Sequence, residues 1–257
     1  METINEPSAL PIYVINLDRA TDRWTNMQQQ FEKAGLQATR FPAIDAKTEL
    51  ERVRARYDEA ASRRYNGAPQ YDTTLGCYAS HYALWETIAR SGQPGVVLED
   101  DLVLQPGLAK ALSISARLIG RCRYLRLSAL NPKRSFQRIG SLEDGHELIC
   151  YHRRPLGTQA YVMSADGAKA ALDQSQRWFM PVDDYLDRFW LHGLPPLALL
   201  PFHVEHADEG QSFIQDGSDS YKRTALDRLR FKWNRSLDKV KAQLWLRRNP
   251  PGSDLLD

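Results

Sequence analysis

The chain has 257 residues, of which 42% are hydrophobic, and a formal net charge of +2. That length supplies one large α/β domain or two small ones, and the near-neutral charge gives no reason to expect a nucleic-acid partner. The cysteines lack CxxC spacing, no apolar run reaches the roughly 18 residues of a membrane span, and the acidic start of the chain lacks the apolar core of a signal peptide. These features predict a cytoplasmic protein with reduced thiols.

Segments typical of strands alternate with segments typical of helices along most of the chain. The strand-like segments cover residues 11–17, 39–44, 96–101, 124–127, 136–139, 147–151, 159–163 and 197–204. The helix-like segments cover residues 20–35, 48–64, 75–90, 107–119, 165–172 and 182–191. This alternation predicts a Rossmann-like α/β domain with a mostly parallel central sheet. The two strand-like pieces around Glu143-Asp144-Gly145 predict a small antiparallel hairpin.

The first strand ends in the polar sequence Asn16-Leu17-Asp18-Arg19, which could contact the base or ribose of a nucleotide. Arg19 and Arg23 lie one helical turn apart, so they could face phosphates together or form a salt-bridge pair at the start of the helix. The chain contains neither GxxxxGKS/T nor GxGxxG. A bound nucleotide would therefore not be held by a glycine-rich phosphate loop.

Three consecutive carboxylates, Glu99-Asp100-Asp101, follow the apolar run Val96-Val97-Leu98. Ligands of open α/β sheets bind at the carboxyl ends of the strands, which is where these acids emerge. If the extended geometry continues, Glu99 and Asp101 point to one side and Asp100 to the other. Because neighbouring carboxylates repel, a hard cation such as Mg²⁺ or Mn²⁺ would stabilise them and could also bind nucleotide phosphates. The alternative is a solvated strand end that caps the next helix.

Several other polar residues allow two interpretations. Ser80 and His81 belong to a helix that opens with Gly76-Cys77, and they could line a ligand pocket or be structural. Thr158 could contact a ligand or belong to an ordinary turn after Gly157. Asp183 and Asp184 begin a helix, where they could supply a general base near a sugar hydroxyl or cap the helix. His206 could be a third metal ligand or an ordinary surface or core histidine.

Residues 220–248 form a basic segment with ten Lys or Arg and two acids, so it carries +8 and leaves −6 on the rest of the chain. Apolar residues recur there at helical spacing, which predicts one apolar stripe: Leu226, Leu229, Trp233, Leu237, Val240 and Leu244. A basic amphipathic helix of this kind can lie on an anionic membrane surface. Alternatively, the stripe packs on the domain or on a second copy of the chain. We therefore expect a domain over residues 1–219 and a basic amphipathic tail over residues 220–257.

Taken in order, these motifs resemble those of glycosyltransferase family 25, the lipooligosaccharide-type β-glycosyltransferases that are related to collagen galactosyltransferases. The resemblance covers residues 11–214, and the ordered set is more specific than any one motif. The motifs are Val14-Ile15-Asn16-Leu17-Asp18-Arg19 with Arg23, Phe41-Pro42-Ala43-Ile44-Asp45, Gly76-Cys77 with Ser80, His81 and Trp85, Leu98-Glu99-Asp100-Asp101, Gly157-Thr158 with Ala160-Tyr161, Pro181 with Asp183, and Ser212 with Ile214.

The resemblance implies a GT-A-like nucleotide-binding domain that transfers a hexose from a UDP-sugar and inverts the configuration at the anomeric carbon. Galactose is the hexose that the resemblance favours. The acceptor would be an oligosaccharide or glycolipid of the lipopolysaccharide type. By the same resemblance, Glu99, Asp101 and His206 hold Mn²⁺ or Mg²⁺, and Asp183 is the catalytic base, with Asp184 as the second candidate. The implied nucleotide-sugar site comprises Asn16, Leu17, Arg19, Arg23, Asp45, Ser80, His81, Asp100 and Thr158.

Two other classes of function stay open. A metal-dependent phosphohydrolase could use the same carboxylates, and a non-catalytic membrane-docking protein could use the basic tail alone. For a transferase, the tail would hold the enzyme peripherally at the inner face of the membrane, where lipid-linked acceptors lie. The apolar stripe could also serve a homodimer.

Overall fold

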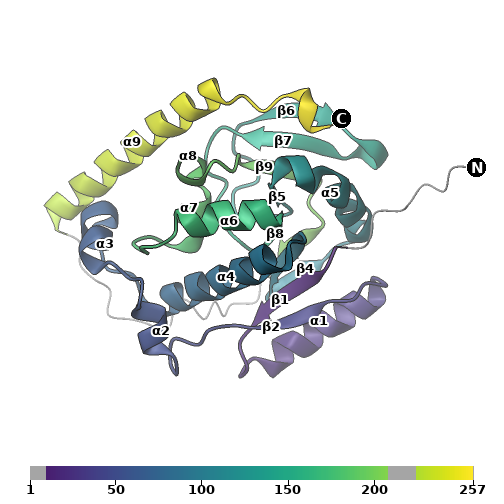
Figure 1. The fold of residues 1–257 in the computed structure, drawn as a ribbon, viewed down its shortest axis with the longest axis horizontal. Coiled ribbons are helices and arrows are strands. Elements are labelled where there is room, and N and C mark those ends of the chain that lie inside the picture. The colour runs from purple at the N-terminus through teal and green to yellow at the C-terminus, as the bar shows by residue number, and fades with distance from the viewer. Residues whose placement is uncertain (1–9, 208–223, 257) are drawn as a thin grey trace, which may run out of the picture.

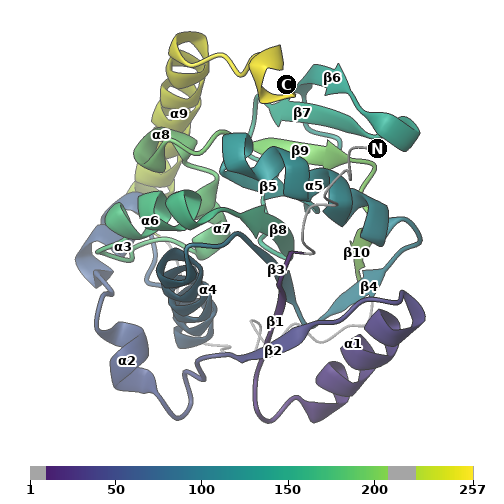
Figure 2. The ribbon, with the colours of Figure 1, turned by 45° about the vertical axis from the view of Figure 1, so that its right-hand side comes forward.

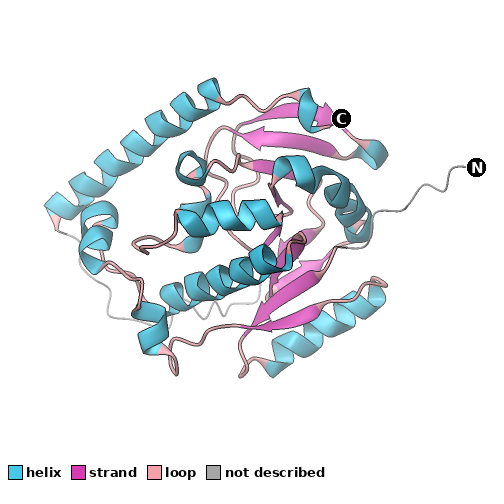
Figure 3. Cartoon of the chain, viewed as in Figure 1, coloured by secondary structure: helices cyan, strands magenta, loops and turns pink. Residues whose placement is uncertain are grey.

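The computed structural model describes residues 10–207 and 224–256. The main sheet has eight strands: β1 (Ile12–Asn16), β2 (Thr39–Pro42), β3 (Gly95–Glu99), β5 (Tyr124–Arg126), β6 (Phe136–Ser141), β7 (Glu147–Tyr151), β8 (Ala160–Met163) and β9 (Leu197–Leu200). Their order across the sheet is β2-β1-β3-β8-β5-β9-β7-β6. Figure 1 and Figure 3 show the sheet crossing the molecule, and Figure 2 labels each of its strands. Two short strands, β4 (Leu102–Leu104) and β10 (Val204–His206), pair beside it.

The helices are α1 (Thr21–Lys33), α2 (Leu50–Arg54), α3 (Glu59–Asn66), α4 (Asp72–Ser91), α5 (Leu108–Cys122), α6 (Ala165–Asp173), α7 (Val182–Leu186), α8 (Phe189–His192) and α9 (Ala225–Arg248). Short 3₁₀ turns cover Glu143–Gly145 and Ser253–Leu255. Helices α1 and α5 cover one face of the sheet, and α4 and α6 cover the other (Figure 2). The predicted α/β class is therefore confirmed.

Side-chain alternation along the strands builds a core on both faces of the sheet. In β3, Val96 and Leu98 pack with the residues of α1 and α5, whereas Val97 packs with those of α4 and α6. All three side chains are buried. A strand that is covered on both faces needs apolar residues at successive positions, which explains the continuous apolar run ahead of the three acids.

The sheet is mixed: most of its strands run in the same direction, as the sequence predicted, but β7 and β8 run the opposite way. β1 runs parallel to β2 and β3, and β5 runs parallel to β9, but β8 is antiparallel to both of its neighbours, β3 and β5. The chain reaches β8 through the β6–β7 hairpin and a loop. No crossover helix lies between β5 and β8, so nothing forces β8 into the direction parallel to β5. The predicted hairpin itself is confirmed at one edge of the sheet.

Two expected helices are each divided in two. Between α2 and α3, Tyr57 forms a β-bridge with Trp178, and the Asp58 side chain caps α3 by accepting a hydrogen bond from the Ala61 backbone N–H at 2.9 Å. Between α7 and α8, Asp187 turns inward to an ion pair. In both places a tertiary contact interrupts a segment whose composition alone permits a continuous helix.

The basic tail forms the predicted helix, α9, which begins at a capping box made by Thr224 and Asp227. It packs against α3 and α8 at the side of the α/β body (Figure 2). None of the helices described has both the length and the apolar character needed to cross a bilayer. The expected boundary at residues 219 and 220 lies outside the described residues, as do Ser212 and Ile214.

Candidate active site

The carboxyl ends of β1 and β3 lie side by side because these strands are parallel neighbours. A cleft opens there, bounded by the loops after β1 and β2, the first turns of α4 and the end of β3. Most of the residues predicted to bind a nucleotide-sugar or a metal line it: Leu17, Arg19, Arg23, Asp45, Ser80, His81, Glu99, Asp100 and Asp101. The structure therefore brings motifs from distant parts of the chain to one edge of the sheet.

Asp100 contacts β1 and α1. It accepts hydrogen bonds from Asn16 Nδ2 at 2.6 Å and from Arg23 Nη1 at 3.1 Å. Asn16 is buried and is held in turn by Arg40, whose Nε donates to Asn16 Oδ1 at 2.6 Å. Burial raises the pKa of Asp100 above its ordinary value, although the bonds from Asn16 and Arg23 act to lower it. Asp100 therefore links the polar loop after β1 to the acidic strand end.

The loop after β1 is also tied to the loop after β2. Arg19 forms an ion pair with Asp45, so Arg19 and Arg23 have different carboxylate partners although both line the cleft. Ser80 is buried, donates to the Gly76 carbonyl at 2.7 Å and accepts from the Ile44 backbone N–H at 2.8 Å. The bond from Ile44 holds α4 against the segment after β2, so the structural interpretation of Ser80 fits its contacts.

Glu99 contacts α4 and the loop before β8. Its Oε1 accepts from Thr158 Oγ1 at 2.8 Å and lies 3.5 Å from His81 Nε2. Trp85 Nε1 donates to the Tyr161 hydroxyl at 2.8 Å, and that hydroxyl lies 2.9 Å from His81 Nδ1. If Tyr161 donates to Nδ1, the proton of the imidazole sits on Nε2 and faces Glu99. Burial acts to raise the pKa of Glu99, but the nearby His81 ring and the bond from Thr158 outweigh it and lower that pKa.

Asp101 contacts β10. Its Oδ2 lies 3.3 Å from His206 Nε2, and its Oδ1 is buried with no hydrogen-bond partner among the described residues. Burial raises the pKa of Asp101 to about 6, and the charge of Glu99 acts in the same direction. His206 Nδ1 lies 2.9 Å from the Ala207 carbonyl. A proton on Nδ1 would satisfy that carbonyl and leave the Nε2 lone pair facing Asp101, as in histidines that bind metals.

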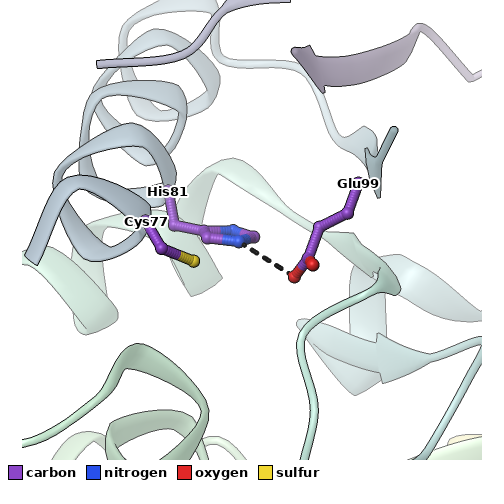
Figure 4. Close-up of side chains that lie close together, drawn as sticks. All are labelled: Cys77, His81 and Glu99. Atoms are coloured by element: carbon purple, nitrogen blue, oxygen red, sulfur yellow. Dashed lines mark ion pairs between the residues drawn. The ribbon is translucent and has the colours of Figure 1, made fainter. Parts of the chain in front are cut away.

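A second group of possible metal ligands adjoins the first. Single ligand atoms of Cys77, His81 and Glu99 all lie within 4.8 Å of one another (Figure 4). Burial raises the pKa of the Cys77 thiol well above its ordinary value, and the carboxylates of Glu99, Asp183 and Asp101 add to the shift. A protonated thiol is a poor ligand, and a thiolate suits softer ions than Mg²⁺. The carboxylate–imidazole pair of Asp101 and His206 is the better site for a hard cation.

Asp183 and Asp184 are adjacent in sequence but differ in their surroundings. Asp183 accepts from the Asp184 backbone N–H at 2.8 Å, and burial raises the pKa of Asp183 to about 6, with Asp184 and Asp187 acting in the same direction. The Asp184 carboxylate is buried and binds Arg235 through two bonds, of 3.1 and 2.6 Å, and Arg154 at 2.7 Å. Burial acts to raise the pKa of Asp184, but the arginine partners outweigh it and lower that pKa. Because arginines bind both of its carboxylate oxygens and its pKa is lowered, Asp184 is poorly suited to accept a proton as a general base.

A buried ion pair that the sequence did not predict holds the loop before β8 in place. Arg126 Nη2 donates to Asp187 Oδ1 at 2.5 Å, and both side chains are fully buried. Arg126 also binds the Gly157 carbonyl at 2.6 Å, and Asp187 Oδ2 accepts from the Leu156 backbone N–H at 2.9 Å. The pair thereby fixes the loop that carries Thr158. An arginine inside an otherwise apolar strand was the one available signal, because a buried cation requires a buried partner.

Comparison with known proteins adds to this geometry. The sequence model of "Glycosyltransferase family 25 (LPS biosynthesis protein)" matches residues 9–186. A glycosyltransferase 25 family member from Anopheles gambiae is 30% identical over 82% of this chain and 39% of its own length. Procollagen galactosyltransferase 1 from Danio rerio is 28% identical over 68% of this chain and 30% of its own length.

The matched relatives are longer and not uniform in activity. The chain spans less than half of the length of these curated relatives, as the shares of 39% and 30% show. A relative from Rattus norvegicus, 25% identical over 68% of this chain and 32% of its own length, is named a probable inactive glycosyltransferase 25 family member 3. Membership of the family therefore does not by itself establish catalysis.

Proposed function

The chain belongs to glycosyltransferase family 25, and from that premise we propose that it transfers a hexose from a UDP-sugar to an oligosaccharide or glycolipid acceptor with inversion. Galactose is the preferred candidate because one relative is named a procollagen galactosyltransferase. A lipopolysaccharide-type acceptor agrees with the description of the family. The observation that carries the proposal is the cleft in which Glu99, Asp100 and Asp101 each have a different set of partners.

The donor would bind along the loops after β1 and β2. Arg19 and Asp45, which line the cleft, would contact the uridine side, and buried Asn16 would position Asp100. Arg23 also lines the cleft and would face the diphosphate. Guanidinium groups bind phosphate oxygens strongly in such partly buried positions. His81 and Thr158, both held by Glu99, would shape the pocket for the sugar.

Asp101 and His206 are the residues that would hold a divalent cation, with Glu99 next to them. The partnerless Oδ1 of Asp101 and the orientation of the His206 ring fit such an ion. A bound Mn²⁺ or Mg²⁺ would supply positive charge against the diphosphate leaving group. The remaining chemistry belongs to the residues of the chain.

Asp183 would act as the general base. In a single displacement, the acceptor hydroxyl oxygen forms a bond to the anomeric carbon while the bond to the UDP oxygen breaks, and the hydroxyl proton passes to a base. The raised pKa of Asp183, about 6, suits a base that must hold this proton near neutral pH. Asp187 and Arg126 would position it indirectly by fixing the loop around Gly157.

Calorimetric titration of UDP into the full chain tests the proposal. We expect binding with Mn²⁺ that is lost with EDTA and that falls at least tenfold in Asp101→Asn. Asp166→Asn is the matched control, because the Asp166 side chain is 78% exposed and pairs only with Lys169 among the contacts described. Folding of each variant is checked by circular dichroism.

Product analysis with UDP-galactose and a glycan acceptor then separates the classes of function. Acceptor-dependent release of UDP supports the transferase. Release of inorganic phosphate without an acceptor would identify a phosphohydrolase, and a folded protein that binds no UDP in the presence of Mn²⁺ would overturn the proposal.

A further inference from the structure

Helix α9 exposes its apolar stripe to solvent. Six large apolar side chains on one face of the helix are each 40% exposed or more, up to 66% for the indole of Trp233. They are Leu226, Leu229, Trp233, Leu237, Val240 and Leu244. Helices on the surface of a globular protein normally bury such a stripe against the core. The exposed stripe of α9 is the opposite arrangement, and a contiguous exposed apolar patch of this kind marks an interaction site.

The inner face of α9 explains why the stripe points outward. Asp238 is buried, accepts from Arg188 Nη2 at 2.9 Å and also bonds the hydroxyl of Tyr65. Arg235 holds Asp184 through two bonds, and Asn234 donates to the Tyr65 carbonyl at 3.0 Å. Rotating α9 to bury the stripe would break these contacts and leave charges unpaired in the interior, which is costly. The exposure is therefore fixed by the fold.

Basic side chains border the stripe on both sides. At 3.6 residues per turn, Arg230, Lys241 and Arg248 fall along one border, and Lys232 and Lys239 fall along the other. All five are exposed. The two acids of α9 are directed elsewhere: Asp227 binds the helix N-terminus in the capping box, and Asp238 faces the body. The outer surface of this helix is thus apolar in the middle and cationic along its edges.

The charge of α9 favours a flat anionic surface over a second copy of the chain. The stripe runs along the helix from Leu226 to Leu244, between the two cationic borders. Two copies packed stripe to stripe would bring their cationic borders together. Anionic lipid headgroups complement these borders, and the apolar stripe suits the region just beneath them.

We propose that the outer face of α9 is a membrane-docking surface for an anionic lipid bilayer. The helix would lie parallel to the membrane surface, between the lipid headgroups and the acyl chains. The ion pairs on its inner face hold the α/β body against it. This inference does not rest on the transferase reaction, because it follows from the exposure and charge of α9 alone. It supports a peripheral location at a membrane face, where a glycolipid acceptor would also be present.

Co-sedimentation of the full chain with lipid vesicles tests the docking surface. We expect binding to phosphatidylcholine vesicles that contain phosphatidylglycerol, and at least tenfold weaker binding to phosphatidylcholine alone. Leu229→Ser combined with Trp233→Ser should weaken the binding at least tenfold. The matched control is Leu50→Ser with Leu130→Ser, because those leucines are 41% and 52% exposed and lie outside α9. Lys232→Glu with Lys239→Glu should reduce binding only to the anionic vesicles.

Three outcomes would overturn the inference. The first is a folded wild-type chain that binds neither kind of vesicle. The second is equal loss of binding in the stripe variant and its control. The third is a dimer that becomes a monomer in the stripe variant while vesicle binding is absent, which would assign the stripe to a second copy. UDP titration of the same samples keeps this test separate from the transferase: vesicle binding without UDP affinity would retain the surface and remove the proposed reaction.

Discussion

At the scale of single residues, Asp183 and Asp184 show how partners decide the role of a carboxylate. Asp184 has two arginine partners and a lowered pKa, whereas Asp183 accepts from the Asp184 backbone N–H and its pKa is raised by burial to about 6. The first is fixed in its charged form. The second can hold a proton near neutral pH and release it, which is what a catalytic base requires.

The raised pKa of Asp183 predicts a pH-dependent effect of Asp183→Asn on stability. The folded pKa of about 6 lies above the ordinary 3.8, so keeping the charge costs free energy that is absent near pH 4, grows as the pH rises and is complete above pH 6. Asp183→Asn should therefore raise the free energy of unfolding at pH 7.5, by up to about 3 kcal/mol, and change it little at pH 4. Urea unfolding at both pH values measures this, and an equal gain at both would contradict it. Transfer activity should be lost at every pH.

How far the sequence predicts the site depends on the kind of residue. Glu99, Asp100 and Asp101 could be placed because acids that follow a buried strand must emerge at its end. The Arg126–Asp187 pair could not, because the partners are sixty-one positions apart and nothing in the pattern around Asp187 distinguishes it from its acidic neighbours. The structural role of Ser80 was equally unreadable, since it depends on a backbone N–H supplied by Ile44.

At the scale of elements, α9 is a structural part of the body as well as the carrier of the exposed stripe. The buried guanidinium of Arg188 has Asp238 as its closer carboxylate partner, at 2.9 Å, whereas the nearer carboxylate oxygen of Asp184 lies 4.0 Å away. Asp238→Ala should therefore lower the free energy of unfolding by about 3–5 kcal/mol. The neighbouring Lys239→Ala, at an exposed position, should change it by less than about 0.5 kcal/mol. Chemical denaturation measures the free energy of unfolding of both variants. If Asp238→Ala lowers it no more than Lys239→Ala does, the ion pair between Arg188 and Asp238 does not stabilise the fold.

The strands of the main sheet and most of the helices followed from alternation and helical spacing, and so did the hairpin. The short pair of β4 and β10 did not. The periodicity of residues 225–248 also predicted the helix and its stripe. It could not predict which face meets the body, because an apolar stripe normally turns inward. Arg188 and Asp184, far away in the chain, decide the orientation by binding Asp238 and Arg235.

At the scale of the whole molecule, the proposed donor site draws on β1, α4, β3, the loop before β8 and β10, so a ligand that binds all of them should stabilise the complete fold. UDP and Mn²⁺ together at about 100 times the dissociation constant should add about 2.7 kcal/mol, or roughly 5–10 °C in Tm. Differential scanning fluorimetry measures this shift. It should be absent with EDTA and in Asp101→Asn, and a shift that survives both would place the ligand elsewhere.

The position of β3 in the middle of the sheet has a consequence for how the chain folds during synthesis. Its neighbours are β1, made long before it, and β8, made some sixty residues after it. Until Ala160–Met163 leaves the ribosome, the free edge of an apolar strand stays open and can pair with other chains. Such non-local pairing also slows folding. The nascent chain should therefore depend on chaperones until β8 closes that edge, and fragments that end before residue 160 should aggregate.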